Sequence, residues 1–217
     1  MRHPTNPNLT LYYENTYQGL PIQFEKGPFI IEYLQCLHKT MTLAIEQYRE
    51  VFEFRFDLRL PSSHTPQGTA YQNEVIDRFI ASFKAKIRHN RSMAIRENKY
   101  AHDTVVRYVW AREFGQHGRP HYHLAIFLNK DAYCALGRFK LGRDNMFNRL
   151  HEAWASALGL PSDATVGLVE IPDNPYYRMR HDDPASIEAF FFRASYLCKA
   201  ATKSFGDGGH GFGASRI

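Results

Sequence analysis

Residues 52–60 alternate strictly between apolar and charged side chains, and this pattern constrains the fold more than any other stretch of the chain. Successive side chains of a β-strand point to opposite faces, so one face of this segment is apolar and the other is charged. The large apolar residues on one side indicate a central strand with a core beneath it. The charged side consists of Glu53, Arg55, Asp57 and Arg59. We expect it to form an open sheet face, on which the two arginines contact phosphate groups.

Residues 119–128 place His121 and His123 on either side of a tyrosine, at the start of an apolar run. The alternation predicts a strand, in which both histidines project to one face while Tyr122 points to the buried face. A helix would instead separate the two histidines by roughly 200°. Such a pair is weak evidence for a metal site by itself, because surface histidines and hydrogen-bonded core histidines show the same spacing.

The preceding residues, 104–114, are rich in β-branched and aromatic side chains and predict another strand, followed by a turn. An antiparallel hairpin would bring Glu113 opposite or diagonal to His121. Two imidazoles and one carboxylate would then converge, with coordination positions left open for water or substrate. This mixed donor set suits Mn²⁺, Mg²⁺ or Zn²⁺.

Composition indicates the class of partner. The chain of 217 residues has a net charge of +5 and a sequence pI of about 9.1, which favours an anionic partner such as nucleic acid. Its three cysteines form no C-x-x-C pair and argue for a reducing compartment. The sequence has no apolar signal core and no run of roughly 20 apolar residues, so we expect a cytoplasmic protein without membrane contact.

The hydrophobic periodicity predicts an α+β fold. Helical spacing covers residues 28–50, 71–91 and 143–158, and strand patterns cover residues 52–60, 104–114, 120–128 and 166–171. From residue 51 onward, the order strand, helix, strand, strand, helix, strand is that of a ferredoxin-like (split βαβ) antiparallel sheet. We expect the first and third of these strands in the centre, with helices on one face and the other face open.

We divide the chain into three parts. Residues 1–50 are expected to form an N-terminal arm and a helix packed on the core, residues 51–205 the main domain, and residues 206–217 a Gly-rich tail. The first 27 residues are interpreted as an irregular arm with no assignable chemistry.

A last helix is predicted to begin at Pro184 and to continue past Tyr196 to Lys203. Tyr196, Lys199 and Lys203 are spaced i, i+3 and i+7, so they would share one helix face. Nearby ammonium groups favour the phenolate, the form in which a tyrosine is a nucleophile. The competing interpretation is an ordinary amphipathic helix with a tyrosine at the edge of the core.

Together, residues 52–60, Glu113 with His121-Tyr122-His123, and Tyr196-x-x-Lys199 resemble the three motifs of the HUH endonuclease superfamily, which comprises rolling-circle replication initiators and relaxases. Within it, residues 118–123, 193–199 and 212–216 look most like the inovirus replication-protein group that includes the YagK/YfjJ C-terminal domains. The resemblance covers roughly residues 50–217. One tyrosine occupies the third motif, as in single-tyrosine members, and the chain lacks a helicase P-loop.

The resemblance implies metal-dependent nicking and rejoining of single-stranded DNA, including origin or hairpin DNA, through a 5′-phosphotyrosyl intermediate. It implies rolling-circle replication of a phage, prophage or plasmid-like element in the bacterial cytoplasm, with a host helicase as a candidate partner. The implied roles are Glu113, His121 and His123 for Mg²⁺ or Mn²⁺, Tyr196 and Lys199 for catalysis, and Arg55, Arg59, Arg119 and Lys203 for DNA contact.

Other functions stay open at this point. A transposase or relaxase would use the same motifs, and a catalytically idle DNA-binding regulator would keep the basic face without a metal. A zinc-stabilised or metal-hydrolase domain would use His117, His121 and His123 with water as the nucleophile, and would form no covalent adduct.

Overall fold

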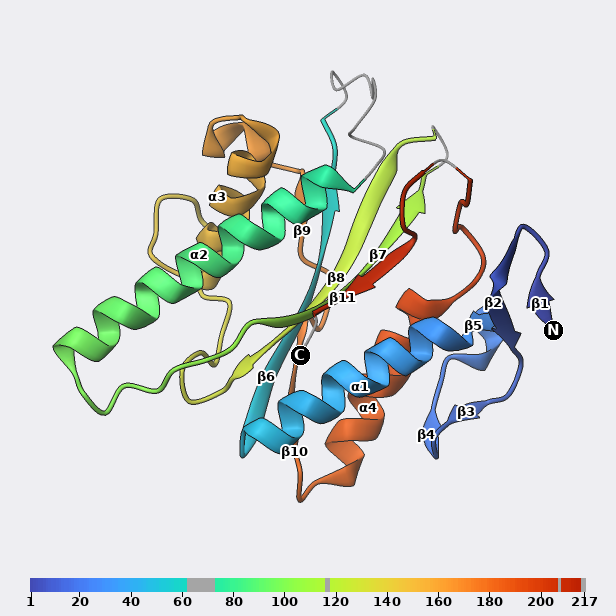
Figure 1. Ribbon diagram of the computed structural model, residues 1–217. Helices are drawn as coiled ribbons and strands as arrows, with labels where there is room; N and C mark the ends of the chain where they lie inside the picture. The colour runs from blue at the N-terminus through green and yellow to red at the C-terminus, as the bar shows by residue number, and fades with distance from the viewer. Residues whose placement is uncertain (62–72, 116–117, 207, 216–217) are drawn as a thin grey trace.

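The computed structural model describes residues 1–61, 73–115, 118–206 and 208–215 (Figure 1). The protein is a mixed α+β fold with antiparallel sheets and, within these residues, four α-helices. The main sheet has the strand order β10 (Tyr176–Arg180), β6 (Glu50–Arg59), β8 (Pro120–Asn129), β7 (Arg107–Phe114), β11 (Phe212–Ala214), and β9 (Val169–Glu170) also pairs with β6. The strands β6 and β8 therefore lie side by side in the centre, as expected.

Helices cover both faces of this sheet (Figure 1). On one face, α2 (Glu74–Glu97) and α3 (Met146–Leu158) pack on the phenylalanines of β6 and on Tyr122. On the other face, α1 (Ile31–Gln47) and α4 (Pro184–Ser195) pack on Val51, Ala125 and Phe127.

The expectation that one face of the sheet is open was therefore wrong. The row of side chains that begins with His121 and His123 continues with Ala125 and Phe127, which are apolar and need cover. Phe190 of α4 supplies part of it, with its ring 5.3 Å from that of Phe127.

The N-terminal residues are more regular than expected. The strands β1 (Arg2–His3), β2 (Asn6–Tyr12) and β5 (Phe29–Ile30) form a small sheet, and β3 (Thr16–Tyr17) pairs with β4 (Leu20–Pro21). Short 3₁₀ turns are η1 (Phe24–Lys26), η3 (Ser162–Thr165) and η4 (Tyr196–Cys198). Because Phe29 and Ile30 pair with β2, α1 begins at Ile31 and not at Pro28.

The C-terminal segment joins the main sheet, because β11 pairs with β7 on the edge opposite β10. Gly213 lies opposite Trp110 in this pairing. A Cβ at residue 213 would lie 2.5 to 2.6 Å from three atoms of the indole, so glycine is needed for this close approach.

In the described part of the chain, none of the helices has the length and apolar character to cross a membrane.

We predict that Gly213→Ala destabilises the fold, because the added methyl group must displace a buried indole. Overpacking of this kind costs about 1–3 kcal/mol, which lowers the Tm of a domain of this size by roughly 2–10 °C. Thermal unfolding followed by circular dichroism measures the change. Gly115→Ala is the matched control, because the nearest described atom would be 3.9 Å from its Cβ. Equal Tm values for the two variants would contradict the proposed packing.

Candidate active site

The hairpin of β7 and β8 brings Glu113 directly opposite His121, which confirms the expected pairing. His123 lies two residues further along β8 on the same face. The three side chains offer ligand atoms that all lie within 4.8 Å of one another. Glu113 and His123 are buried and His121 is half-buried.

Asp57 fixes the orientation of His123. It lies opposite His123 in the pairing of β6 and β8, and its Oδ1 is 2.6 Å from His123 Nδ1. The other ring nitrogen, Nε2, is 3.5 Å from Glu113 Oε2 and makes no hydrogen bond to a described residue. A carboxylate that binds one nitrogen of an imidazole while the other faces a shared centre is the usual outer contact of a metal-binding histidine.

The two histidines have opposite pKa shifts. Burial lowers the pKa of His123, but its hydrogen bond with Asp57 and the attraction of the nearby Glu113 carboxylate outweigh burial and raise the pKa overall. Burial lowers the pKa of His121, and repulsion from His123 adds to this effect. Burial also opposes ionisation of Glu113, but the nearby His123 ring and the charge of Lys203 overcome it and lower its pKa. Glu113 is therefore ionised, as a ligand must be.

These residues fit a divalent cation. Two imidazoles and one ionised carboxylate are a donor set used for Zn²⁺, Mn²⁺ and related ions. The buried Nε2 of His123, which lacks a hydrogen-bond partner among the described residues, is a ligand atom directed into the cluster. The structure thus contains a possible metal-binding triad, and the donor chemistry does not specify which ion it prefers.

Two lysines neutralise Glu113. Lys203 Nζ is 2.8 Å from Oε1, and Lys199 Nζ is 3.1 Å from Oε2. Lys199 Nζ also lies 3.6 Å from the centre of the Tyr196 ring, so it contacts the face of the ring. The side chain of Lys203 is completely buried, which differs from the expected surface contact with DNA. Burial of Lys203 against Glu113 explains the difference.

The prediction that the last helix continues to Lys203 was also wrong. The helix α4 ends at Ser195, and the turn η4 follows it. Residue 199 pairs with Phe29 and the Ala200 amide donates to the Pro28 carbonyl, so the N-terminal segment holds the chain in place just after η4. Tyr196, Lys199 and Lys203 therefore do not share a helix face, although Lys199 contacts both Tyr196 and Glu113.

Tyr196 lies beside the histidines. It is half-buried, and its ring centre is 6.1 Å from that of His123. Both residues line a cavity of about 330 Å³, together with Gln23, Arg55, Asp57, Pro172 and Arg193. The cavity combines two guanidinium groups, a phenol and the outer part of the candidate metal cluster, which suits an anionic ligand.

The three arginines that were predicted to contact DNA differ in their exposure to solvent. Arg55 is buried beneath α4, where its Nη1 donates to the carbonyl of Arg193 at 3.3 Å. We expected Arg55 on an open face, and this was wrong, although Arg55 does line the cavity. Arg59 is half-exposed and forms an ion pair with Glu170, and Arg119 is exposed just before β8. His117, considered as an alternative zinc ligand, lies outside the described residues.

Sequence reasoning missed three residues of this cavity. Asp57 was assigned to the charged face of β6 but not to His123, although the antiparallel register of the two central strands would have paired them. Gln23 comes from the arm to which no chemistry was assigned, and its side-chain amide donates to the carbonyls of residues 192 and 193. Arg193 lies in a segment that carries the family resemblance, but its place in this cavity depends on how α4 packs and not on local spacing.

We predict that Asp57→Asn weakens metal binding by about 10- to 100-fold, the usual effect of removing an outer carboxylate from a ligand histidine. Mn²⁺ titration by calorimetry, with purified metal-free protein, gives the affinity. Glu50→Gln is the matched control, because Glu50 is in the same strand and pairs with Lys130 away from the cluster. An unchanged affinity in Asp57→Asn would show that Asp57 does not orient a ligand.

A solved structure shows a distant likeness to the chain. It is the N-terminal nuclease domain of the minute virus of mice non-structural protein 1, described with Zn²⁺ coordinated in its active-site pocket. The alignment covers 75% of this chain and 70% of that chain, at 11% identity and a TM-score of 0.25. A likeness of this size carries no argument about fold or activity.

Sequence relatives cover nearly the whole chain. YagK of Escherichia coli (strain K12) is 32% identical over 210 residues, which are 93% of this chain and 98% of YagK. YfjJ of the same strain is 35% identical over 202 residues, which are 88% of this chain and 97% of YfjJ. A family model described as the YagK/YfjJ C-terminal domain matches residues 13–215. The protein therefore belongs to the YagK/YfjJ C-terminal domain family, the group that its sequence resembles.

Proposed function

We propose that this protein nicks and rejoins single-stranded DNA through a covalent bond to Tyr196, with a divalent cation held by Glu113, His121 and His123. The single observation that carries the proposal is the position of Tyr196, whose ring lies 6.1 Å from that of a candidate metal ligand. A phenol next to two imidazoles and a carboxylate has the groups needed for transesterification of a phosphodiester.

The residues of the chain have distinct roles in this reaction. The Tyr196 oxygen bonds to phosphorus while the bond from phosphorus to the 3′ oxygen breaks, the phenol loses its proton, and the 3′ oxygen gains one. The product is a 5′-phosphotyrosyl link, and attack by a 3′-hydroxyl reverses the step. A bound Mg²⁺ or Mn²⁺ would supply electrostatic stabilisation of the phosphate and of the leaving oxygen. Asp57 holds the ring of His123 in place.

The cavity beside Tyr196 is the proposed position of the phosphate next to the reacting bond. Arg55 and Arg193 line it, and Arg55 Nε is a buried donor that has no hydrogen-bond partner among the described residues. A guanidinium that is already desolvated binds a phosphate oxygen strongly, because little hydration is lost when the ligand arrives. Arg59 and Arg119 are further proposed phosphate contacts outside the cavity.

The proposed biological role is initiation of rolling-circle replication of a phage, prophage or plasmid-like element. It follows from the resemblance of the three motifs to those of single-tyrosine HUH endonucleases, and the same motifs would serve a transposase or relaxase. The ferredoxin-like arrangement is part of this proposal, and it is supported by the strand order β9, β6, β8, β7 with every pairing antiparallel.

The decisive variant is Tyr196→Phe, which removes one oxygen and leaves the ring contacts with His123 and Lys199. We expect cleavage of labelled single-stranded oligonucleotides with Mn²⁺, and the SDS-resistant adduct, to vanish while DNA affinity persists. Tyr176→Phe is the matched control, because Tyr176 is exposed on β10. Mass spectrometry of the trapped peptide checks the attachment site, and a nucleotide on a residue other than Tyr196 would overturn the assignment.

The metal has its own test. His121→Ala and His123→Ala should abolish cleavage, because each removes a ligand, whereas DNA binding through phosphate contacts should largely survive. His181→Ala, at an exposed histidine away from the cluster, is the control. Cleavage and anisotropy are measured on the same oligonucleotide, with and without EDTA. Undiminished cleavage in EDTA would exclude the proposed metal role.

A second candidate function, a DNA-binding regulator without catalysis, is favoured by one observation. Both carboxylate oxygens of Glu113 already form ion pairs with Lys203 and Lys199, so the carboxylate is neutralised without a metal. This function predicts no heat of Mn²⁺ binding, no adduct with any strand, and DNA affinity that is the same with and without EDTA.

A further inference from the structure

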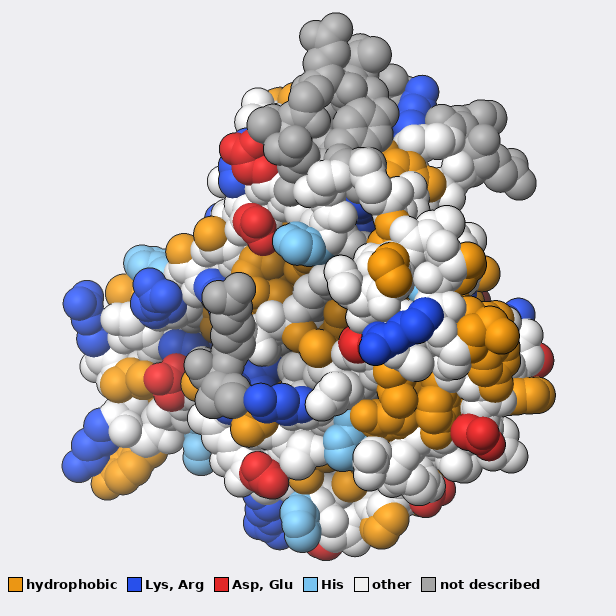
Figure 2. Space-filling view, turned by 45° about the vertical axis from the view of Figure 1, so that its right-hand side comes forward, with side chains coloured by type: hydrophobic (Ala, Val, Ile, Leu, Met, Phe, Trp, Pro, Cys, Tyr) orange, Lys and Arg blue, Asp and Glu red, His pale blue; other side chains and the backbone are white. Residues whose placement is uncertain are grey.

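The positive charge of the chain is concentrated in two segments on the face of the sheet opposite the candidate active site. Residues 84–99 and 138–152 together contain ten Lys and Arg against three Asp and Glu, whereas the rest of the chain contains 17 against 19. These segments therefore account for the whole positive excess. In Figure 2, Lys and Arg side chains gather toward the left, the side on which Figure 1 places α2.

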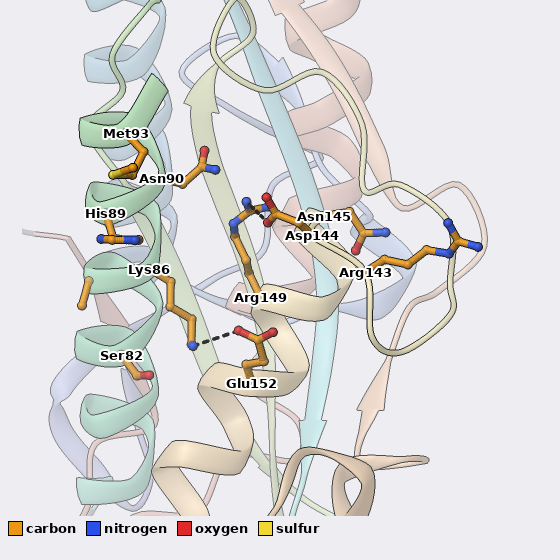
Figure 3. A pocket seen from close by; sticks show the side chains of 11 residues that line it. Ser82, Lys86, His89, Asn90, Met93, Arg143, Asp144, Asn145, Arg149 and Glu152 are labelled. Atoms are coloured by element: carbon orange, nitrogen blue, oxygen red, sulfur yellow. Dashed lines mark hydrogen bonds and ion pairs between the residues drawn. The ribbon is translucent and has the colours of Figure 1, made fainter. Parts of the chain in front are cut away.

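The two segments meet in a groove between α2 and the start of α3, with a volume of about 650 Å³ (Figure 3). Lys86 and Asn90 of α2 point toward Arg149 and Glu152 of α3. Within the groove, Lys86 Nζ lies 2.9 Å from Glu152, and Arg149 forms an ion pair with Asp144. The first pair joins α2 to α3 and the second lies within the α3 wall, so little free charge is left inside the groove.

The free charge lies in the loop that leads to α3. Arg138, Lys140 and Arg143 are exposed, and in the described part of the chain no ion pair engages their side chains. Between the first two lies Phe139, which is 58% exposed. Its ring is stacked on Phe147 at 5.1 Å, so it is supported from one side. An exposed, supported aromatic ring between cations is a stacking platform for a base.

We propose that this α2–α3 surface, defined by residues 84–99 and 138–152, binds single-stranded DNA outside the active site. Phosphates contact the loop cations and a base stacks on Phe139. A single strand fits better than a duplex, because paired bases are already stacked on their neighbours and cannot cover the ring. The choice of DNA as the strand rests on the proposed function, in which a single DNA strand is the substrate.

The test is the salt dependence of binding. The Tyr196→Phe protein in EDTA is titrated into a labelled oligothymidylate of about 30 nucleotides, long enough for more than one site of ~4–16 nucleotides. Adding Arg138→Glu with Arg143→Glu should weaken binding about tenfold or more. The slope of log K against log salt concentration should become shallower by about 1.4, which is about 0.7 for each lost phosphate contact. Lys39→Glu with Arg178→Glu, exposed residues of α1 and β10, changes the net charge equally and should leave the slope unaltered.

Phe139 gives an independent readout. Phe139→Ala should weaken binding about fivefold or more, with an unchanged salt slope, and Phe139→Trp should restore it. Circular dichroism verifies that each variant is folded. The proposal is overturned if the loop double variant matches its control, or if a blunt duplex of the same length binds equally well and responds equally to both sets of variants.

This experiment separates the surface from the nuclease. No cleavage is needed for binding in EDTA, so a protein that forms no adduct can still show the predicted change in salt slope. Conversely, adduct formation by the wild type together with an unaltered slope in the loop variant would remove the surface and leave the proposed nuclease intact.

Discussion

The buried carboxylate of Glu113 is the charge on which the assembly of the candidate site depends. An ionised group in a sheet interior is costly unless cations surround it. Lys199 and Lys203 supply two positive charges from the segment after α4, and the His123 ring lies 3.5 Å from the same carboxylate on the neighbouring strand. Lys203 and Glu113 are 90 residues apart in the sequence. The ion pairs therefore hold the segment that contains Tyr196 against the end of β7 and β8.

Local patterns predicted the strands that form this site. The alternation in residues 52–60 and 120–128 depends only on side chains two apart, and the short turn after β7 restricts the register of the hairpin. The opposition of Glu113 and His121 could therefore be deduced from the amino-acid sequence alone. The partner of His123 required one further step, the register between β6 and β8, which are separated in the sequence by α2 and β7.

The nature of the charged sheet face could not be predicted, because alternation separates two faces without specifying what covers each. Glu53 is completely buried, and neither carboxylate oxygen has a hydrogen-bond partner among the described residues. Burial raises its pKa well above the usual value, although Arg55 and Arg193 oppose this shift. Because burial favours the uncharged form of Glu53, α4 can cover a position that the sequence pattern assigns to a charged face. The same cover buries Arg55 and makes it part of a cavity.

The candidate site also shows why the ends of the chain cannot be treated as appendages. Gln23 lines the cavity, and the pairing of Phe29 with Lys199 holds the lysine that contacts Glu113. At the other end, β11 pairs with β7, and the Gly211 carbonyl accepts a hydrogen bond from the amide of Arg112, the residue before Glu113. Both ends therefore support the strand and the segment that position the cluster. Because a catalytic geometry tolerates errors of only about 0.5 Å, these contacts are part of the site's construction even though neither end supplies a candidate ligand.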